Sequence, residues 1–192
     1  MKKRIAAYPI APLFIERWSP RALSKELLSD EELMVLFEAA RWAPSSYNNQ
    51  PWRFIYAKRT TAYWDILFNL LVEANQVWAK NAAVLLVICS SNVFSFNNKP
   101  ARTHSFDTGA AWENLTLQGH LNNIIVHGMQ GFDYERAQKE LKIPDNYTVE
   151  AMAALGKKGE KESLPIELQQ KEEPSDRNPL EKFVFEGFFK KE

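Results

Sequence analysis

The feature that most constrains the fold is an unbroken apolar run near the middle of the chain, Ala82–Cys89. It is far shorter than the roughly 20 residues that a membrane span needs. Its length and its β-branched content are typical of a strand that is covered on both faces of its sheet. The chain therefore has to build layers of structure around this strand.

The spacing of apolar residues predicts the other elements. Helices are expected over about residues 30–42, 60–76, 107–121 and 133–141, and further strands over 52–57 and 148–155. The first of these helices starts with a capping box at Ser29-Asp30-Glu31-Glu32, and Asp107 and Asp133 are expected to cap two others. Residues 91–105 are expected to be irregular, and the charged residues 157–175 to be exposed. Helices outnumber strands and do not alternate with them, which predicts a mixed α+β layered fold and one domain over residues 1–192.

The charge balance and the cysteine content exclude several classes of protein. The 24 basic and 24 acidic residues cancel, whereas a nucleic-acid-binding domain usually carries a basic excess. The single cysteine, Cys89, excludes an intrachain disulfide and favours a reducing compartment. The start of the chain makes a poor signal peptide. We therefore expect a cytoplasmic protein that binds neither nucleic acid nor a membrane.

The common nucleotide, hydrolase and metal motifs do not occur. There is no G-x-G-x-x-G after a strand, no phosphate-binding P-loop and no G-x-S-x-G. The three histidines, His104, His120 and His127, are not at metal-ligand spacings, so no metal site is expected.

Two polar segments are candidates for ligand binding. In Arg17-Trp18-Ser19-Pro20-Arg21, two guanidinium groups four residues apart would share one face if the segment were helical, and arginine suits phosphate. The alternative is a solvated surface charge pair. In Pro44–Trp52, two prolines enclose Ser45, Ser46, Asn48 and Gln50, whose side chains both donate and accept hydrogen bonds. That set suits the polar edge of a ligand or a polyol chain, and the alternative is an ordinary Asn/Ser-rich turn.

Taken together, these segments resemble a known family. Arg-x-Ser-x-Arg at 17–21, followed by Pro-Ser-Ser-x-Asn-x-Gln-Pro-Trp at 44–52, resembles the nitroreductase superfamily of FMN-dependent oxidoreductases. Further along the chain, Asp107–Leu115 resembles the central dimer-interface helix of that family, and His127–Asp133 resembles its flavin-edge loop. The matches run in the family's order over nearly the whole chain.

The resemblance implies a role for each matching residue. Arg17, Ser19 and Arg177 would hold the FMN phosphate, and Arg21 and Asn75 would reach the pyrimidine edge of the flavin. The backbone near Gln130 and Gly131 would lie at flavin N5, so no side chain is expected to be catalytic. The full set of implied cofactor-binding residues is Arg17, Trp18, Ser19, Arg21, Pro44, Ser45, Ser46, Asn48, Gln50, Asn75, Met129, Gln130, Gly131 and Arg177.

The resemblance also implies an assembly. The family's three-layer fold has a mostly antiparallel central sheet flanked by helices. Its members are obligate homodimers with FMN at the subunit interface, so the 44–52 loop would close a flavin held mainly by the partner subunit. The apolar tail, residues 177–192, would wrap around that partner, which would make the exchange of C-terminal tails part of the dimer.

The implied activity is a ping-pong reaction. NADH or NADPH would reduce flavin N5, and the flavin would then reduce a small organic acceptor such as a nitroaromatic, a quinone or an enone. Phe94, Phe96 and His104 lie in the segment expected to cover the open flavin face. A flavin-binding or storage protein, or another flavin chemistry such as that of a dehydrogenase or dehalogenase, stays open as an alternative.

Two departures from the family pattern lead to further expectations. Asn123 is expected to replace a glycine after the central helix, because asparagine tolerates left-handed backbone. Ser175 stands where some relatives have a second basic phosphate ligand, which leaves Arg17 and Arg177 as the main cations.

Overall fold

Strand β2 (Val84–Ser91) is the centre of the computed structural model, which describes residues 4–190. All eight of its residues are buried. It pairs antiparallel with β1 (Trp52–Lys58) on one side and with β4 (Tyr147–Lys157) on the other. Strand β3 (Ile124–Met129) pairs antiparallel with β4, which gives the sheet order β1-β2-β4-β3.

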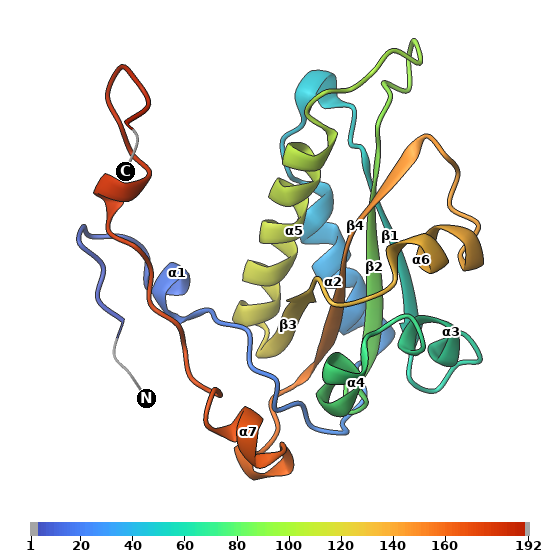
Figure 1. Ribbon diagram of the computed structural model, residues 1–192, viewed down its shortest axis with the longest axis vertical. Coiled ribbons are helices and arrows are strands. Elements are labelled where there is room, and N and C mark those ends of the chain that lie inside the picture. Colours follow the sequence, from blue (N-terminus) through green and yellow to red (C-terminus); the bar gives the residue numbers. More distant parts are fainter. Residues whose placement is uncertain (1–3, 191–192) are drawn as a thin grey trace.

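Both faces of this sheet are covered, as the apolar run predicts. Leu85, Val87 and Cys89 belong to one buried cluster, and the alternate residues Val84, Leu86 and Ile88 belong to the other. Helices α2 (Asp30–Arg41) and α5 (His104–Leu121) cover one face. The other face carries α3 (Trp64–Phe68), α4 (Glu73–Ala79) and α6 (Tyr134–Glu140) (Figure 1). The predicted α+β fold with an antiparallel central sheet between helical layers is confirmed.

Five shorter elements lie outside these layers. Helix α1 (Pro12–Glu16) precedes the Arg17–Arg21 segment, and α7 (Ile166–Gln169) follows β4. Single 3₁₀ turns occupy Ser46–Asn48, Lys161–Ser163 and Leu180–Lys182.

The start of α2 shows how the local sequence fixes an element. The Ser29 hydroxyl accepts a hydrogen bond from the Glu32 backbone N–H at 3.1 Å, and the Glu32 carboxylate accepts one from the Ser29 N–H at 2.9 Å. This reciprocal capping box is the one expected from the sequence. Leu33, Leu36 and Ala40 then face the core on successive turns.

The helix predicted over residues 60–76 is wrong. The segment forms two short helices, α3 and α4, separated by Leu71, which makes a β-bridge to Phe132. The Val72 N–H then donates to the Gly131 carbonyl at 3.1 Å. The apolar spacing is helical, but this long-range pairing takes backbone groups that one continuous helix would use itself.

Strand β3 was not expected, because residues 127–133 were interpreted as a loop. Its side chains Ile124, Val126 and Met129 are buried, while Gly128 is exposed. The segment is short and contains a glycine and a histidine, so its strand propensity is weak. Backbone pairing with β4 stabilises the strand conformation that the local sequence favours only weakly.

Three local expectations also need correction. Helix α5 begins at His104 rather than at Asp107, whose carboxylate instead accepts a hydrogen bond from the Ser46 N–H at 3.1 Å. Arg17 has extended backbone, so Arg17 and Arg21 do not share a helical face. Within the charged segment 157–175, Leu164 and Glu172 are buried, because both pack against the body of the protein.

The two ends of the described chain lie side by side and extend away from the body (Figure 1). The Arg4 side chain joins them by donating from Nε to the Ser175 carbonyl at 2.8 Å. The C-terminal segment carries Phe188 and Phe189, which are 89% and 83% exposed. The expected tail exchange with a partner stays a prediction, and the last two residues of that tail, 191–192, lie outside the described residues.

Among residues 4–190, no helix is both long enough and apolar enough to cross a membrane.

The turn between α5 and β3 yields a stability prediction. Asn123 has a φ of 56°, which confirms the expected left-handed conformation. A β-branched side chain is strained there, so we expect Asn123→Val to lower the free energy of unfolding by about 1–3 kcal/mol. Asn123→Gly should leave stability unchanged or higher, because glycine adopts this conformation freely. Urea denaturation of the two variants checks this, and equal losses for both would contradict it.

Candidate functional site

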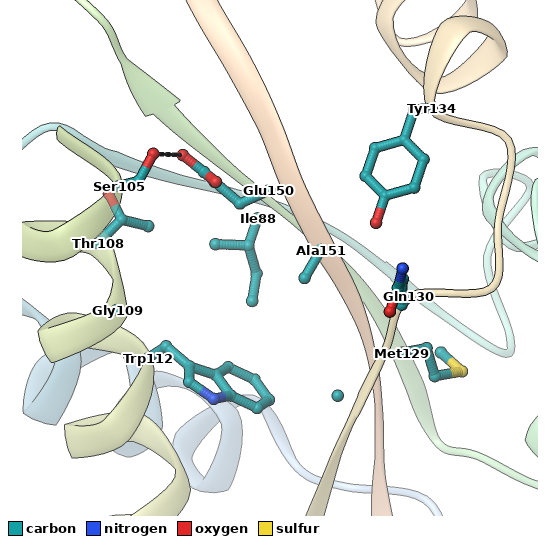
Figure 2. A pocket seen from close by; sticks show the side chains of 11 residues that line it. Ile88, Ser105, Thr108, Gly109, Trp112, Met129, Gln130, Tyr134, Glu150 and Ala151 are labelled. Carbon is teal, nitrogen blue, oxygen red and sulfur yellow. Dashed lines mark hydrogen bonds between the residues drawn. The ribbon is translucent and has the colours of Figure 1, made fainter. Parts of the chain in front are cut away.

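The candidate site is a cavity of about 490 Å³ between α5 and the sheet. It is bounded by the N-terminal half of α5, by β2 and β4, and by the segment that leaves β3 for α6 (Figure 2). The residues that line it are Ile88, Ser105, Thr108, Gly109, Trp112, Gly128, Met129, Gln130, Tyr134, Glu150 and Ala151.

Most of the cavity wall suits a flat, apolar ring. The Trp112 indole projects into it from α5, and the Tyr134 ring stands on the opposite side with its hydroxyl toward Gln130 (Figure 2). A Cβ built on Gly109 would meet nothing within 4 Å, so the lack of a side chain leaves open space beside the helix. A Cβ on Gly128 would lie 3.0 Å from Trp112 Cζ2, so glycine lets the indole lie close to β3. Aromatic walls of this kind stack on planar ligands.

One end of the cavity is polar. The Glu150 carboxylate accepts a hydrogen bond through Oε1 from the Ser105 hydroxyl at 2.7 Å (Figure 2). The buried Ser90 hydroxyl donates to the same oxygen and lies 2.7 Å from His104 Nδ1. The arrangement is not a hydrolytic triad, because one imidazole nitrogen and the carboxylate both contact the same hydroxyl.

Next to the cavity, Asn75 and Gly131 are in contact. The Asn75 side-chain amide donates to the Gly131 carbonyl at 2.9 Å. A Cβ on Gly131 would lie 2.8 Å from Asn75 Nδ2 and 2.9 Å from Val72 Cγ2, so any side chain there would have to displace its neighbours. Two residues expected at the flavin edge, 56 positions apart in sequence, are thus brought together with Gln130.

The guanidinium groups of Arg4, Arg17 and Arg177 lie close together near the C-terminal end of α5. Burial lowers the pKa of Arg4, and the nearby positive charges of Arg177 and Arg17 lower it further, while Asp176 acts in the opposite direction. Arg17 also donates to the Ser19 hydroxyl at 3.2 Å. The structure therefore brings together Arg17, Ser19 and Arg177, the three residues expected to hold a phosphate. Like charges placed this close favour an anion between them.

Two residues that the sequence did not indicate hold the backbone of this cationic segment. The buried Glu172 accepts through Oε1 from the Arg21 and Ala22 N–H groups at 2.7 and 2.8 Å. Its other oxygen, Oε2, is buried and has no hydrogen-bond partner among the described residues. On the other side, His127 Nδ1 lies 2.9 Å from the Pro20 carbonyl, so Nδ1 carries the proton and donates it.

The 44–52 loop lies at the opposite end of α5 from the arginine cluster. Ser46 binds Asp107 near the start of that helix, whereas Glu16, next to Arg17, lies 3.9 Å from His120 at its end. The helix has 18 residues, which corresponds to about 27 Å. Tyr47, Asn48 and Gln50 all have positive φ, so this loop holds an unusual backbone shape.

The aromatic residues expected over the flavin gather at that same loop. Phe94 and Phe96 pack on each other at 5.3 Å between ring centroids and on Tyr47 at 5.6 and 6.2 Å. Within one chain they are not among the residues that line the cavity, whereas His104 adjoins it through Ser105 and Glu150. Their proposed contact with substrate stays a prediction.

Several lining residues were missed from the sequence. Glu150 could have been identified as a candidate from the sequence, because it is the only charged residue among residues 148–156, the apolar stretch of β4. Trp112 and Ser105 gave no such signal, since an aromatic or a hydroxyl side chain on a helix usually has only a packing role. Tyr134 follows the helix cap Asp133, where its local context predicts only a helix start.

Comparison with known proteins identifies similar chains. A model of the Nitroreductase family matches residues 15–76. An oxygen-insensitive NADPH nitroreductase of Helicobacter acinonychis is 34% identical over 79 residues, which are 41% of this chain and 37% of that protein.

Solved structures match over more of the chain. A crystal structure of an oxidoreductase containing FMN is 45% identical, with a TM-score of 0.94 over 98% of this chain and 97% of that one. An FMN-dependent nitroreductase from Clostridium difficile is 23% identical, with a TM-score of 0.66 over 91% of this chain and 96% of that one, and shares the fold.

The contact of His127 with the cationic segment predicts an acid sensitivity. Burial lowers the pKa of His127 from 6.5 to about 4, and the charges of Arg21 and Arg17 add to this. Between these two pH values the unfolded chain binds a proton that the folded protein does not. Stability is therefore lost as the pH falls from about 6.5 toward 4, by up to about 3 kcal/mol.

His127→Asn keeps a donor for the Pro20 carbonyl but cannot titrate, so its unfolding free energy should fall less over that pH range. Denaturation at a series of pH values measures this, with His120→Asn, in the last turn of α5, as the matched control. An unchanged acid sensitivity in His127→Asn would show that another group is responsible.

Proposed function

Because this chain belongs to the nitroreductase family, we propose that it is an NAD(P)H-dependent oxidoreductase that binds FMN and reduces a small organic acceptor. The observation that carries the proposal is that Arg17, Ser19 and Arg177 come together at the C-terminal end of α5, while a cavity with aromatic walls lies along the N-terminal half of the same helix. A cytoplasmic location, where the buried thiol of Cys89 stays reduced, fits this activity.

The donor set at the end of α5 fits a phosphate. Arg4, Arg17 and Arg177 supply guanidinium groups, and the Ser19 hydroxyl lies 3.2 Å from Arg17 Nη1. Without an anion these cations repel one another, and a phosphate would accept their hydrogen bonds in fork geometry. Glu172 and His127 hold the segment in place from two sides, so that the arginines would not have to be ordered when the ligand binds.

The cavity fits the ring system of the same cofactor. Trp112 offers a stacking surface, and Gly109 leaves open space in which a side chain would otherwise stand. At its edge, Asn75 holds the Gly131 carbonyl and thereby fixes the backbone from Gln130 to Gly131. Backbone N–H groups here would face the flavin edge, as expected for N5.

Bound FMN would supply the redox chemistry, which is the ping-pong transfer of a hydride from NADH or NADPH to a nitroaromatic, quinone or enone acceptor. The chain's own residues would orient the two substrates in turn against one ring face and keep bulk water away from it. None of them needs to act as a nucleophile.

The position of the 44–52 loop supports a homodimer. Within one chain this loop and the arginine cluster lie at opposite ends of α5, so Ser45, Ser46, Asn48 and Gln50 would not reach the same ligand as Arg17. We infer that the loop closes the partner's FMN site. The exposed Phe188 and Phe189 of the tail give a partner subunit an apolar surface to cover.

The first test is spectroscopic. Purified protein, mixed with FMN if it is colourless, should show the bands of bound oxidised flavin, and NADH or NADPH should bleach them within seconds under anaerobic stopped-flow conditions. Failure to bind FMN would overturn the proposal. Bound flavin that resists both nicotinamides would instead identify a storage protein or a different flavin chemistry.

The second test concerns the phosphate. Arg17→Ala should weaken FMN binding by about tenfold to a hundredfold, because a hydrogen bond between charged groups contributes about 1.5–3 kcal/mol. Equilibrium titration of the apoprotein measures this. Lys139→Ala, which removes an exposed cation of α6, is the control and should bind FMN like the unaltered protein. Equal affinities of Arg17→Ala and the control would exclude Arg17 from the site.

A further inference from the structure

The cavity contains a negative charge that the binding of the proposed cofactor does not explain. Of the residues that line it, Glu150 is the only one charged at neutral pH. Its side chain is 24% exposed, and it is the only charged residue in the stretch 148–156 of β4. A carboxylate in so apolar a wall is costly unless hydrogen bonds support it.

A network of hydroxyl groups and a histidine holds this carboxylate. Ser90 and Ser105 both donate to Oε1, and His104 Nδ1 is 3.6 Å from the same oxygen. The single proton of the Ser90 hydroxyl goes to Glu150, so Ser90 accepts from His104 Nδ1–H. All of these contacts use Oε1, which leaves Oε2 for a ligand (Figure 2).

The network also fixes where the carboxylate lies. Ser90 is fully buried on β2, and Ser105 lies in the first turn of α5, so the carboxyl group is held between a strand and a helix. A side chain held at two points loses little further freedom when it binds a ligand. Glu150 is thus prepared for one kind of contact, with a cation or a hydrogen-bond donor.

We propose that the cavity selects planar aromatic acceptors that carry a cationic or hydrogen-bond-donating substituent, and that Glu150 is the residue that selects them. This rests on the proposed function, because the acceptor is the substrate of that reaction. Tyr134, on the side of the cavity opposite Trp112, holds the acceptor ring, and Glu150 Oε2 receives the substituent. An anionic acceptor of the same shape is rejected, since no lining residue offers it a positive charge.

Three probes of nearly equal shape test the selection: 4-nitrobenzylamine, 4-nitrobenzyl alcohol and 4-nitrobenzoate. Their dissociation constants are measured on the oxidised FMN-loaded protein without NAD(P)H, from the change in tryptophan fluorescence. The amine should bind about tenfold more tightly than the carboxylate, with the alcohol between them. The opposite order, or equal binding of all three, overturns the proposal without any variant.

Variants then assign the effect to Glu150. Glu150→Gln should bring the three dissociation constants within about twofold of one another, whereas Glu150→Asp keeps the charge and should keep the order. Glu167→Gln is the control, because it makes the same charge change on the exposed helix α7. An order unchanged in Glu150→Gln would show that another group selects the substituent.

The binding readout separates this inference from the proposed function. If NAD(P)H fails to reduce the flavin, the oxidoreductase proposal fails, yet the order of the dissociation constants still reports on Glu150. If NAD(P)H reduces the flavin rapidly but the three dissociation constants do not follow the expected order, the oxidoreductase proposal is supported and the proposed selection by Glu150 is wrong. With NAD(P)H present, the ratio of kcat/KM for the amine and the carboxylate should follow the binding ratio.

Discussion

The burial of β2 on both faces is the constraint on which the rest of the structure depends. One face of the strand needs α2 and α5 as cover, and the other needs the shorter helices. Because α5 has to lie along this sheet, its N-terminal half faces β4 and the end of β3, and the cavity forms between them. The position of the site therefore follows from the packing of the core.

The cationic segment shows a second dependence, between parts of the chain that are far apart. Arg17 and Arg177 lie 160 positions apart, and they come together because the two ends of the chain run side by side. Their mutual repulsion is tolerated because Glu172 and His127 fix the backbone beside them. A site of this kind gains stability when an anion binds, which links FMN affinity to the stability of the fold.

The strands and helices with strong local signals were predictable from the sequence. The capping box of α2 and the apolar run of β2 depend on neighbouring residues alone, and both were predicted correctly. The expected helix over residues 60–76 failed, and β3 was missed, because a bridge to Phe132 and a ladder to β4 decide those segments. Backbone pairing over long separations leaves little trace in local spacing.

For the candidate site, the sequence by itself determined which residue types were present and in what order. The motifs that contain Arg17 and Gln130 were enough to indicate the family and its cofactor. Only the tertiary structure placed Glu150 beside Trp112 in one cavity and engaged one of its oxygens with Ser90 and Ser105. The reason is physical. How strongly a carboxylate holds its charge depends on its burial and its hydrogen-bond partners, and only folding supplies both.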